Sequence, residues 1–521
     1  ALHIDMDEFR RIKGFGYYHL YDLMSKLPKI EDFSLTTTAL DLRPKDFQPL
    51  GEVFFALKRP RGLSINLKQC NHFGKFGVQS LQENIHNVAS LEKLELIFSM
   101  CKVKDEEALK IPEIFTPLPR LKELVLDFHL NDITNKGISG LKNWLKELPD
   151  LTKLTIVASL DDIDDDAVKT FQEGIQHMKN LEYLKLVFSC HQLGDESLTY
   201  IGKLRFANLR YLHLDLGITC SNTGVSALEP FLSHPTNLEN LRFDFGMPKG
   251  ELGDKAATSI ASALGKLKNL KNLYLNLREW MITDKGLQQV IEAVSSLPQL
   301  VRWNNQLLFC RKISDKGYSV VSKCIPKMQN LKHLKFQLEG CDQLSDGTLN
   351  SFKELLMSDL KLHSFRLNMD DSSITDKGFS SLMLGISKQT RLRKLTIKFY
   401  GCQGLTNKGI HPLGTGLAPL RRLRDLTLMF TRISKFGDEG MKYIGEAVAY
   451  LSELRKFALD ILECPLITDR GMDHLKNGLL YCKKLRTLLV NDRFCEKISR
   501  NYHKTLNAVL SKALPYYEKD Q

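Results

Sequence analysis

A repeat of about thirty residues constrains this chain more than any other feature. The run Leu270-Lys-Asn-Leu273-Tyr-Leu275-Asn-Leu277 places apolar residues at positions 0, 3, 5 and 7. Steps of 28 to 32 residues separate copies of this frame, which number 16 when two weaker early copies are included. Their position-0 residues, here called anchors, are Ile30, Pro60, Leu91, Leu121, Leu151, Leu181, Leu209, Leu238, Leu270, Leu300, Leu331, Leu362, Leu392, Leu423, Leu454 and Leu485.

Each copy reads as a strand followed by a helix. Positions 3, 5 and 7 alternate with polar residues, which predicts a half-buried strand. A second motif follows about 13 residues after the anchor, as in Ile282-Thr283-Asp284-Lys285-Gly286-Leu287. Ser or Thr there is typical of a helix N-cap, and the acid beside it favours the positive end of the helix dipole. Strand and helix in about 30 residues predict an α/β right-handed solenoid (a horseshoe), with a parallel sheet on the concave face and helices on the convex face.

The two motifs together resemble leucine-rich repeat proteins. The resemblance is to the ribonuclease-inhibitor-like, cysteine-containing subclass found in F-box substrate adaptors, and it covers most of the chain. We predict a helical cap over residues 1–26, a repeat array over 27–500, and a C-terminal cap and tail over 501–521. This resemblance specifies a fold, whereas function depends on the surface that each such protein presents.

The cysteines fit a structural role. There are 11, an odd number that argues against a closed disulfide framework and favours a reducing compartment. We predict that nine line the strand exits as packing residues and form no metal site, and that Cys324 and Cys482 are buried in helices. The nine lie nine to eleven residues after their anchors: Cys70, Cys101, Cys190, Cys220, Cys310, Cys341, Cys402, Cys464 and Cys495.

Motifs of catalysis are not found in the sequence. It contains no GxxxxGK[ST] phosphate loop, no HExxH zinc motif and no GxSxG nucleophile motif. The acidic run at residues 161–166 lacks the glycine and distal glutamate of a calcium loop and instead falls where a helix N-cap is expected. No apolar stretch is long enough for a membrane span. We therefore predict a non-enzymatic protein with no catalytic residue, cofactor or metal, and no membrane association.

The concave sheet is the first candidate binding surface. Side chains at positions 4 and 6 point away from the core, and in the middle repeats they form a basic and aromatic row beside a row of acids and amides. Such a surface could hydrogen-bond an extended partner, although stacked amides could also simply bond one another. The predicted partner-binding residues of this concave face are Lys185, His213, Asp215, Arg242, Asp244, Tyr274, Asn276, Gln306, Lys335, Gln337, Arg366 and Asn368.

A basic edge is the second candidate surface. The chain carries a net charge of +12, and between Arg391 and Arg432 nine basic residues face one acid, Asp425. Most lie one or two residues from an anchor, where cations could bind an acidic partner or simply offset the dipoles of preceding helices. The predicted residues of this basic edge are Arg391, Arg393, Lys394, Arg421, Arg422, Arg424, Lys483, Lys484 and Arg486.

These observations favour a protein-interaction scaffold that binds through its concave face, aided by the basic edge. One alternative is a substrate-recognition subunit of a ubiquitin ligase, which would need an F-box from outside this chain. A third is a regulator of a GTPase or another enzyme, by likeness to ribonuclease inhibitor and Ran GTPase activators. We expect acidic protein partners in preference to nucleic acid, and a cytoplasmic setting, with cytoskeletal, ciliary and nuclear locations left open. The oligomeric state is not indicated by the sequence.

Overall fold

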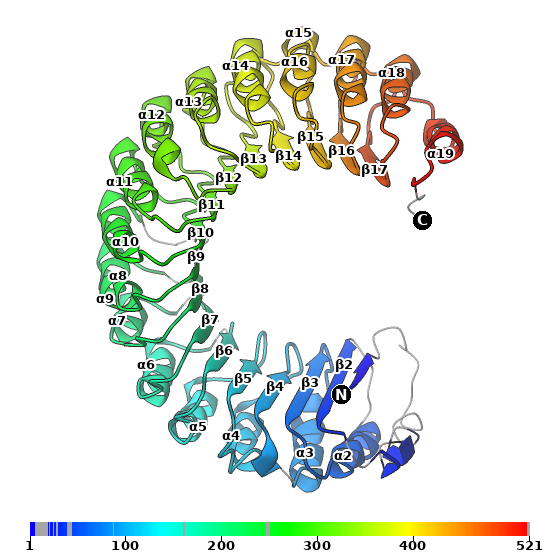
Figure 1. Ribbon diagram of the computed structural model, residues 1–521. Coiled ribbons are helices and arrows are strands. Elements are labelled where there is room, and N and C mark those ends of the chain that lie inside the picture. The colour runs from blue at the N-terminus through cyan, green and yellow to red at the C-terminus, as the bar shows by residue number, and fades with distance from the viewer. Residues whose placement is uncertain are drawn as a thin grey trace. The chain divides into compact units, whose positions relative to one another are not determined.

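The computed structural model describes residues 1–5, 19, 21–23, 25–27, 30–38, 44–86, 88–159, 162–190, 192–217, 219–245 and 251–517. It divides into two compact units, Ala1–Gly250 (unit 1) and Glu251–Gln521 (unit 2). Within each unit a strand alternates with one or two helical segments along the whole length, as Figure 1 shows.

Unit 1 contains nine described strands and, besides short helical turns, eight described α-helices. The strands are β1 (Leu2–Asp5), β2 (Asp32–Thr38), β3 (Gly62–Lys68), β4 (Lys93–Ile97), β5 (Glu123–Asp127), β6 (Lys153–Ala158), β7 (Tyr183–Ser189), β8 (Tyr211–Gly217) and β9 (Asn240–Asp244). The α-helices are α2 (Phe47–Phe55), α3 (Val78–Asn84), α4 (Asp105–Ile114), α5 (Asn135–Lys146), α6 (Asp165–Ile175), α7 (Asp195–Gly202), α8 (Asn222–Ala227) and α9 (Glu229–Ser233). The short turns are η1 (Pro44–Asp46), η2 (Phe73–Gly77) and η3 (Val88–Ser90).

Unit 2 follows the same plan in its described residues. The strands are β10 (Asn272–Asn276), β11 (Arg302–Gln306), β12 (His333–Gln337), β13 (Ser364–Asn368), β14 (Lys394–Lys398), β15 (Asp425–Met429), β16 (Lys456–Asp460) and β17 (Thr487–Asn491). The helices are α10 (Asp254–Lys266), α11 (Asp284–Ser295), α12 (Asp315–Cys324), η4 (Ile325–Lys327), α13 (Asp346–Leu356), α14 (Asp376–Ser387), α15 (Asn407–Ile410), α16 (Leu413–Leu417), α17 (Asp438–Ala449), α18 (Asp469–Leu479) and α19 (Tyr502–Ala513).

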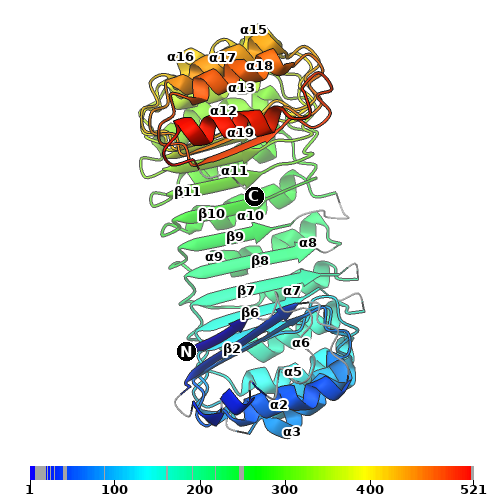
Figure 2. The same cartoon turned by 90° about the vertical axis from the view of Figure 1, so that its right-hand side faces the viewer.

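Neighbouring strands within a unit are parallel and aligned by repeat position. Leu273 pairs with Trp303, and Trp303 with Leu334, so residues at one position form a column that crosses the strands. In Figure 2, strands β7, β8 and β9 of unit 1 lie side by side in front of the helices of their repeats. Strands pack about 4.8 Å apart whereas helices need about 10 Å, so the sheet occupies the concave side of each unit.

The predicted fold class is therefore confirmed. Each unit is an α/β leucine-rich-repeat solenoid with a parallel sheet. Strands β2 to β9 and β10 to β17 supply one strand for each of the 16 predicted repeats within the described residues.

Apolar columns form the core of each unit. Leu273, Leu275 and Leu277 are at most 2% exposed, as the 0-3-5-7 frame requires. One residue breaks the column at position 5. Asn305 is 0% exposed there, and neither its amide nitrogen nor its amide oxygen has a hydrogen-bond partner among the described residues.

In nine repeats, a carboxylate at the helix start binds the helix start of the next repeat. The Thr283 hydroxyl caps α11 by accepting from the backbone N–H of Lys285 (3.2 Å), as predicted. The Asp254 carboxylate also accepts two hydrogen bonds from Thr283, from its N–H (2.8 Å) and from its hydroxyl (2.6 Å). The same pair of bonds, here called the carboxylate clasp, joins Asp105 to Thr134, Asp195 to Ser221, Asp284 to Ser314, Asp315 to Ser345, Asp346 to Thr375, Asp376 to Thr406, Asp438 to Thr468 and Asp469 to Ser499.

The clasp explains the glycine of the helix-start motif. A Cβ added at Gly286 would lie 2.3 Å from the Asp254 carboxylate, which is well inside van der Waals contact. A Cβ at Gly317 would meet Asp284 at 2.4 Å in the same way. Glycine avoids this close contact at Gly286 and Gly317, whereas in the Asp315 clasp Thr348 takes the same position and its hydroxyl donates to the carboxylate.

The strand-exit cysteines form a second column. The Cys310 thiol donates to the Leu277 carbonyl (3.1 Å) and the Cys341 thiol to the Leu307 carbonyl (3.0 Å), so each links two repeats. All described cysteines are free thiols, and no described group of His, Cys, Asp and Glu is arranged to hold a metal. The prediction for the two remaining cysteines was partly wrong. Cys482 is buried but follows α18, and Cys324 lies in α12 but is partly exposed.

The ends differ from the repeats. Strand β1, which the sequence analysis did not predict, pairs with β2. Most of the predicted N-terminal cap lies outside the described residues. At the other end, Leu506, Leu510 and Leu514 of the α19 segment are buried. None of the described helices has the length and apolar character that crossing a bilayer demands.

Candidate functional site

Five of the predicted concave-face residues form one cluster in unit 1. Lys185, His213 and Arg242 are register neighbours on β7, β8 and β9, and Asp215 and Asp244 are neighbours two residues further along β8 and β9. The Arg242 guanidinium lies 3.1 Å from the Asp244 carboxylate. The sequence prediction that these residues share one face is therefore met in unit 1.

Burial and neighbouring charge perturb two groups of this cluster. Burial, together with the cations of Arg242 and Lys185, lowers the pKa of His213 to about 4. Burial raises the pKa of Asp215 to about 6, helped by the nearby Asp244 carboxylate. His213 is consequently neutral at pH 7, and Asp215 gives up its proton only above the usual range of a carboxyl group. Partly buried titratable groups of this kind are common where a protein binds a ligand.

Two tyrosines adjoin the cluster. The rings of Tyr183 and Tyr211 stack at position 2 of their repeats, with centroids 4.3 Å apart and an angle of 8° between their planes. Burial raises the pKa of Tyr183 to about 12, so its hydroxyl stays protonated. The sequence analysis did not single out this pair, although tyrosine at position 2 of two successive repeats was a readable signal.

The remaining concave-face residues lie in unit 2. Lys335 pairs with Arg366, and Asn276, Gln306, Gln337 and Asn368 form a register column two residues further along their strands. Tyr274 lies on β10, where its register partner is Asn304.

Two of the amides in that column have a local structural role. The Asn276 side chain accepts from the backbone N–H of Arg278 (3.1 Å), and the Asn368 side chain accepts from that of Asp370 (3.0 Å). These bonds close the turn after each strand.

The basic edge also lies in unit 2, at the start of strands β14 to β17. Arg391, Arg421, Arg422 and Arg424 are exposed, and so are Lys483, Lys484 and Arg486. Arg393 is exposed and Lys394 half-buried. Two of the cations are paired with acids: Lys394 lies 3.6 Å from Asp425 and Lys484 lies 2.5 Å from Glu453.

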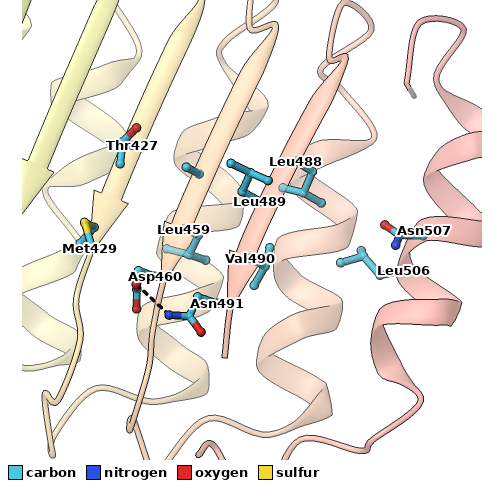
Figure 3. A pocket seen from close by; sticks show the side chains of 11 residues that line it. Thr427, Met429, Leu459, Asp460, Leu488, Leu489, Val490, Asn491, Leu506 and Asn507 are labelled. Carbon is cyan, nitrogen blue, oxygen red and sulfur yellow. Dashed lines mark hydrogen bonds between the residues drawn. The ribbon is translucent and has the colours of Figure 1, made fainter. Parts of the chain in front are cut away.

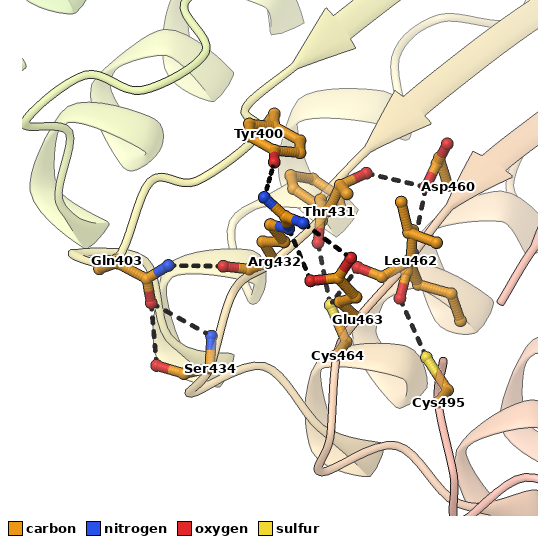
Figure 4. Close-up of polar contacts among 12 residues, drawn as sticks. Tyr400, Gln403, Thr431, Arg432, Ser434, Asp460, Leu462, Glu463, Cys464 and Cys495 are labelled. Carbon is orange, nitrogen blue, oxygen red and sulfur yellow. Dashed lines mark hydrogen bonds and ion pairs between the residues drawn. The ribbon is translucent and has the colours of Figure 1, made fainter. Parts of the chain in front are cut away.

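Three basic residues counted with this cluster in the sequence lie elsewhere. Lys398 is at the end of β14, and Lys408 is in α15. Arg432 follows β15 at the opposite, strand-exit edge, where its guanidinium forms a bidentate ion pair with Glu463 (2.6 and 3.0 Å) and contacts the Tyr400 hydroxyl (Figure 4). Their sequence proximity to the basic edge therefore did not place them on it.

A pocket at the C-terminal end of unit 2 was not predicted. It has a volume of about 410 Å³ and lies beside β16, β17 and α19, as Figure 3 shows. Leu489 on its wall is 43% exposed, and the core-facing Leu488 and Val490 are only partly buried. The pocket arises because β17 has no following repeat strand to cover it within the described residues.

Comparison with known proteins bears on the fold alone. No protein-family model matches the sequence, and the curated proteins contain no match. Among solved structures, the chain is similar to one described as the Rad7 and Elc1 complex in yeast, with 17% identity, a TM-score of 0.43, and coverage of 71% of this chain and 86% of the matched chain. It is also similar to one described as the TLR13–ssRNA13 complex, with 18% identity, a TM-score of 0.46, and coverage of 91% of this chain and 61% of the matched chain. This chain thus spans less than two thirds of that second matched chain, and no property of either protein is transferred to it.

Proposed function

We propose that this protein is a non-enzymatic scaffold that binds a protein partner through the concave face of its repeats, with the basic edge assisting. The observation that carries the proposal is the unit 1 cluster of Lys185, His213, Asp215, Arg242 and Asp244. Three adjacent strands, β7, β8 and β9, present these residues side by side on one face of the sheet.

The cluster suits recognition better than catalysis. His213 and Asp215 lie two residues apart on β8, and no described group of His, Cys, Asp and Glu there is arranged to hold a metal. Arg242 and Asp244 bind each other, which restrains both side chains and lowers the entropic cost of binding a partner on this face.

The test is affinity purification from native cells followed by mass spectrometry. One variant reverses Lys185 and Arg242 to Glu in unit 1, and a second reverses Lys335 and Arg366 to Glu in unit 2. Each removes two concave-face cations and leaves the core unchanged. A partner retained by wild type and lost in at least one variant supports the proposal. Retention of every partner by both variants would refute it.

The identity of the partner separates the candidate functions. Ubiquitin-ligase subunits among the proteins lost would favour a substrate-recognition role. A GTPase would favour a regulatory role.

A further inference from the structure

One column of the basic edge has a composition found nowhere else in the described ladders. The residue directly after each anchor, position 1, forms a backbone ladder at the start of the strands. The N–H of Arg424 donates to the carbonyl of Arg393 (2.9 Å), that of Arg455 to Arg424 (2.8 Å), and that of Arg486 to Arg455 (2.8 Å). Four successive repeats thus place arginine at the same position, and we call Arg393, Arg424, Arg455 and Arg486 the arginine column.

The same ladder in unit 1 is nearly balanced in charge. Its rungs, joined by the same type of backbone hydrogen bond, are Glu31, Arg61, Glu92, Lys122, Thr152, Glu182, Arg210 and Glu239. Arg61 there forms ion pairs with Glu92 (2.9 Å) and Glu31 (3.8 Å), and Arg210 pairs with Glu239 (3.6 Å). Position 1 can therefore hold acids next to bases without disturbing the fold.

The arginine column lacks such neutralisation. Among the described residues, none of its four guanidinium groups lies within ion-pair distance of a carboxylate, and Arg486 instead lies over the Tyr516 ring at 5.9 Å. Rungs of a parallel ladder are about 4.8 Å apart, so like charges there repel one another. Four adjacent arginines destabilise the fold, and the unit 1 ladder shows that the same position accepts a balanced set of charges. The arginine column is therefore better explained by binding than by folding.

The ladder continues beyond the arginines with no acidic residue. His363 precedes Arg393, and its backbone N–H donates to the Lys332 carbonyl (2.7 Å). Burial lowers the pKa of His363, and Arg393, Lys332, Arg391 and Arg422 lower it further, which shows that these cations share one local field. The ladder from Lys332 to Arg486 therefore crosses six repeats without an acidic rung, with five cations and the neutral His363.

We propose that the arginine column binds an extended acidic segment of a protein, a run of Asp or Glu that lies across the repeats along this edge. The inference rests on the proposed scaffold function and names the chemistry of the partner. Arginine grips carboxylates through two parallel N–H···O bonds, and a flexible acidic run can adjust its spacing to the rungs.

A single nucleic-acid strand fits this edge less well. Such strands are held by aromatic side chains on which successive bases stack. Apart from His363, no rung from Lys332 to Arg486 carries an aromatic ring. The exposed Tyr450 and Tyr481 precede the strands of the last two repeats only.

The experiment measures binding of a fluorescein-labelled peptide of about 20 glutamates by fluorescence anisotropy, at about 50 and about 300 mM NaCl. The column variant replaces Arg393, Arg424, Arg455 and Arg486 with Gln. The matched control replaces Lys285, Lys316, Lys377 and Lys408 with Gln. Those lysines are also exposed and also one per repeat in unit 2, but they lie at the starts of helices. The two variants lose the same charge, and circular dichroism verifies that both are folded.

We expect the column variant to bind the peptide about tenfold more weakly than wild type at low salt, and the control to stay within about twofold. High salt should remove most of the difference because exposed charges are screened. Equal losses in the two variants would reduce the effect to net charge and overturn the proposal. So would tighter binding of a 20-nucleotide single strand than of the peptide.

Two further readouts separate this inference from the concave-face proposal. The variant with Lys335 and Arg366 reversed should keep most of its peptide affinity even if it loses its cellular partner. In addition, bound peptide should raise the pKa of His363, followed by NMR of its imidazole protons, because the anion offsets the surrounding cations. An unchanged His363 pKa at saturating peptide would place the peptide elsewhere.

Discussion

Units 1 and 2 build the same repeat but place their polar groups differently. Unit 1 balances acids and bases along its position 1 ladder, and its sheet carries a mixed cluster of basic and acidic residues on β7, β8 and β9. Unit 2 leaves four arginines unbalanced at its edge and places an asparagine without a hydrogen-bond partner in its core. Because the leucine frame and the carboxylate clasps are shared, these differences are not demanded by the fold. They show where each unit has room to specialise.

The largest expected effect tests what the two units share. Asp315 accepts four hydrogen bonds from Ser345 and Thr348, and Asp165 in unit 1 accepts three from Gly194 and Ser197. We expect Asp315→Ala and Asp165→Ala each to lower the free energy of unfolding by about 2–4 kcal/mol, because buried donors lose their acceptor. Chemical denaturation measures both. A loss in only one unit would mean that the shared framework is not equally important.

The Asp315 clasp also predicts a pH dependence. Burial alone would raise its pKa, but the hydrogen bonds from Ser345 and Thr348 outweigh burial and lower it. The folded state then holds this carboxylate ionised where the unfolded state is protonated. Its contribution is therefore present above the unfolded pKa near 3.8 and is lost as pH falls below it. As pH falls below 4, the free energy of unfolding of Asp315→Ala, measured by denaturation, should decrease less than that of wild type.

The next effect concerns unit 2 alone. Asn305→Leu should raise the free energy of unfolding by about 1–3 kcal/mol, since a buried amide without partners is costly and leucine has the same branching and number of heavy atoms. Leu275 and Phe336, its register neighbours, already supply an apolar environment. The matched control is Asn304→Leu on the adjacent, partly exposed position. A destabilised N305L protein would show that Asn305 has a partner or role that the described contacts lack.

A smaller effect belongs to unit 1. His213, with its pKa lowered to about 4, favours the folded state above pH 6.5, and this contribution is lost as pH falls toward 4. Asp215, with its pKa raised to about 6, acts oppositely, since the folded state binds its proton more tightly and gains stability as pH falls from 6 toward 3.8. The two trends offset each other in wild type. Asp215→Asn should therefore steepen the acid-side loss of stability by about 1 kcal/mol between pH 7 and 4.5, after allowing for solvent screening.

Denaturation at those two pH values checks this prediction. His213→Gln is the informative counterpart, because it should flatten or reverse the same slope. Equal slopes in the two variants would contradict the assignment of opposite pKa shifts to these neighbours.

The smallest effect would make unit 2 resemble unit 1. Arg424→Glu places an acid between Arg393 and Arg455 and recreates the alternation seen around Arg61. We expect a gain of about 0.5 kcal/mol at low salt that disappears at high salt, as is usual for exposed pairs. Arg424→Gln, which only removes repulsion, should give a smaller gain. A loss of stability in Arg424→Glu would mean that the arginine column stabilises the fold.

Periodicity made the fold readable from the sequence. Leu273, Leu275 and Leu277 reveal the strand, and Thr283 reveals the helix start, because each reflects a contact within its own repeat. Contacts between repeats were harder to predict. Asp284 was assigned to the helix dipole, whereas its carboxylate binds Ser314 of the next repeat, and Gly286 received no explanation.

The candidate surfaces followed the same rule. Residues at equal repeat positions, such as Lys185 and His213, were correctly grouped because register fixes them. Arg432 was grouped with the basic edge by closeness in sequence alone, and the turn after β15 carries it to the opposite edge. The pocket beside α19 could not be predicted, because it depends on how the last repeat ends.

The carboxylate clasp has a consequence for how such a chain can change length. From Asp284 to Asp376, each repeat offers an acid to the next repeat and receives one from the preceding repeat, so the two ends of one repeat match those of its neighbours. Removing one whole period between Asp284 and Thr406 would bring an acid of one repeat against the hydroxyl of another and leave no orphaned group. Whole repeats in this stretch of unit 2 can therefore be deleted or duplicated while the contacts between neighbouring repeats stay the same.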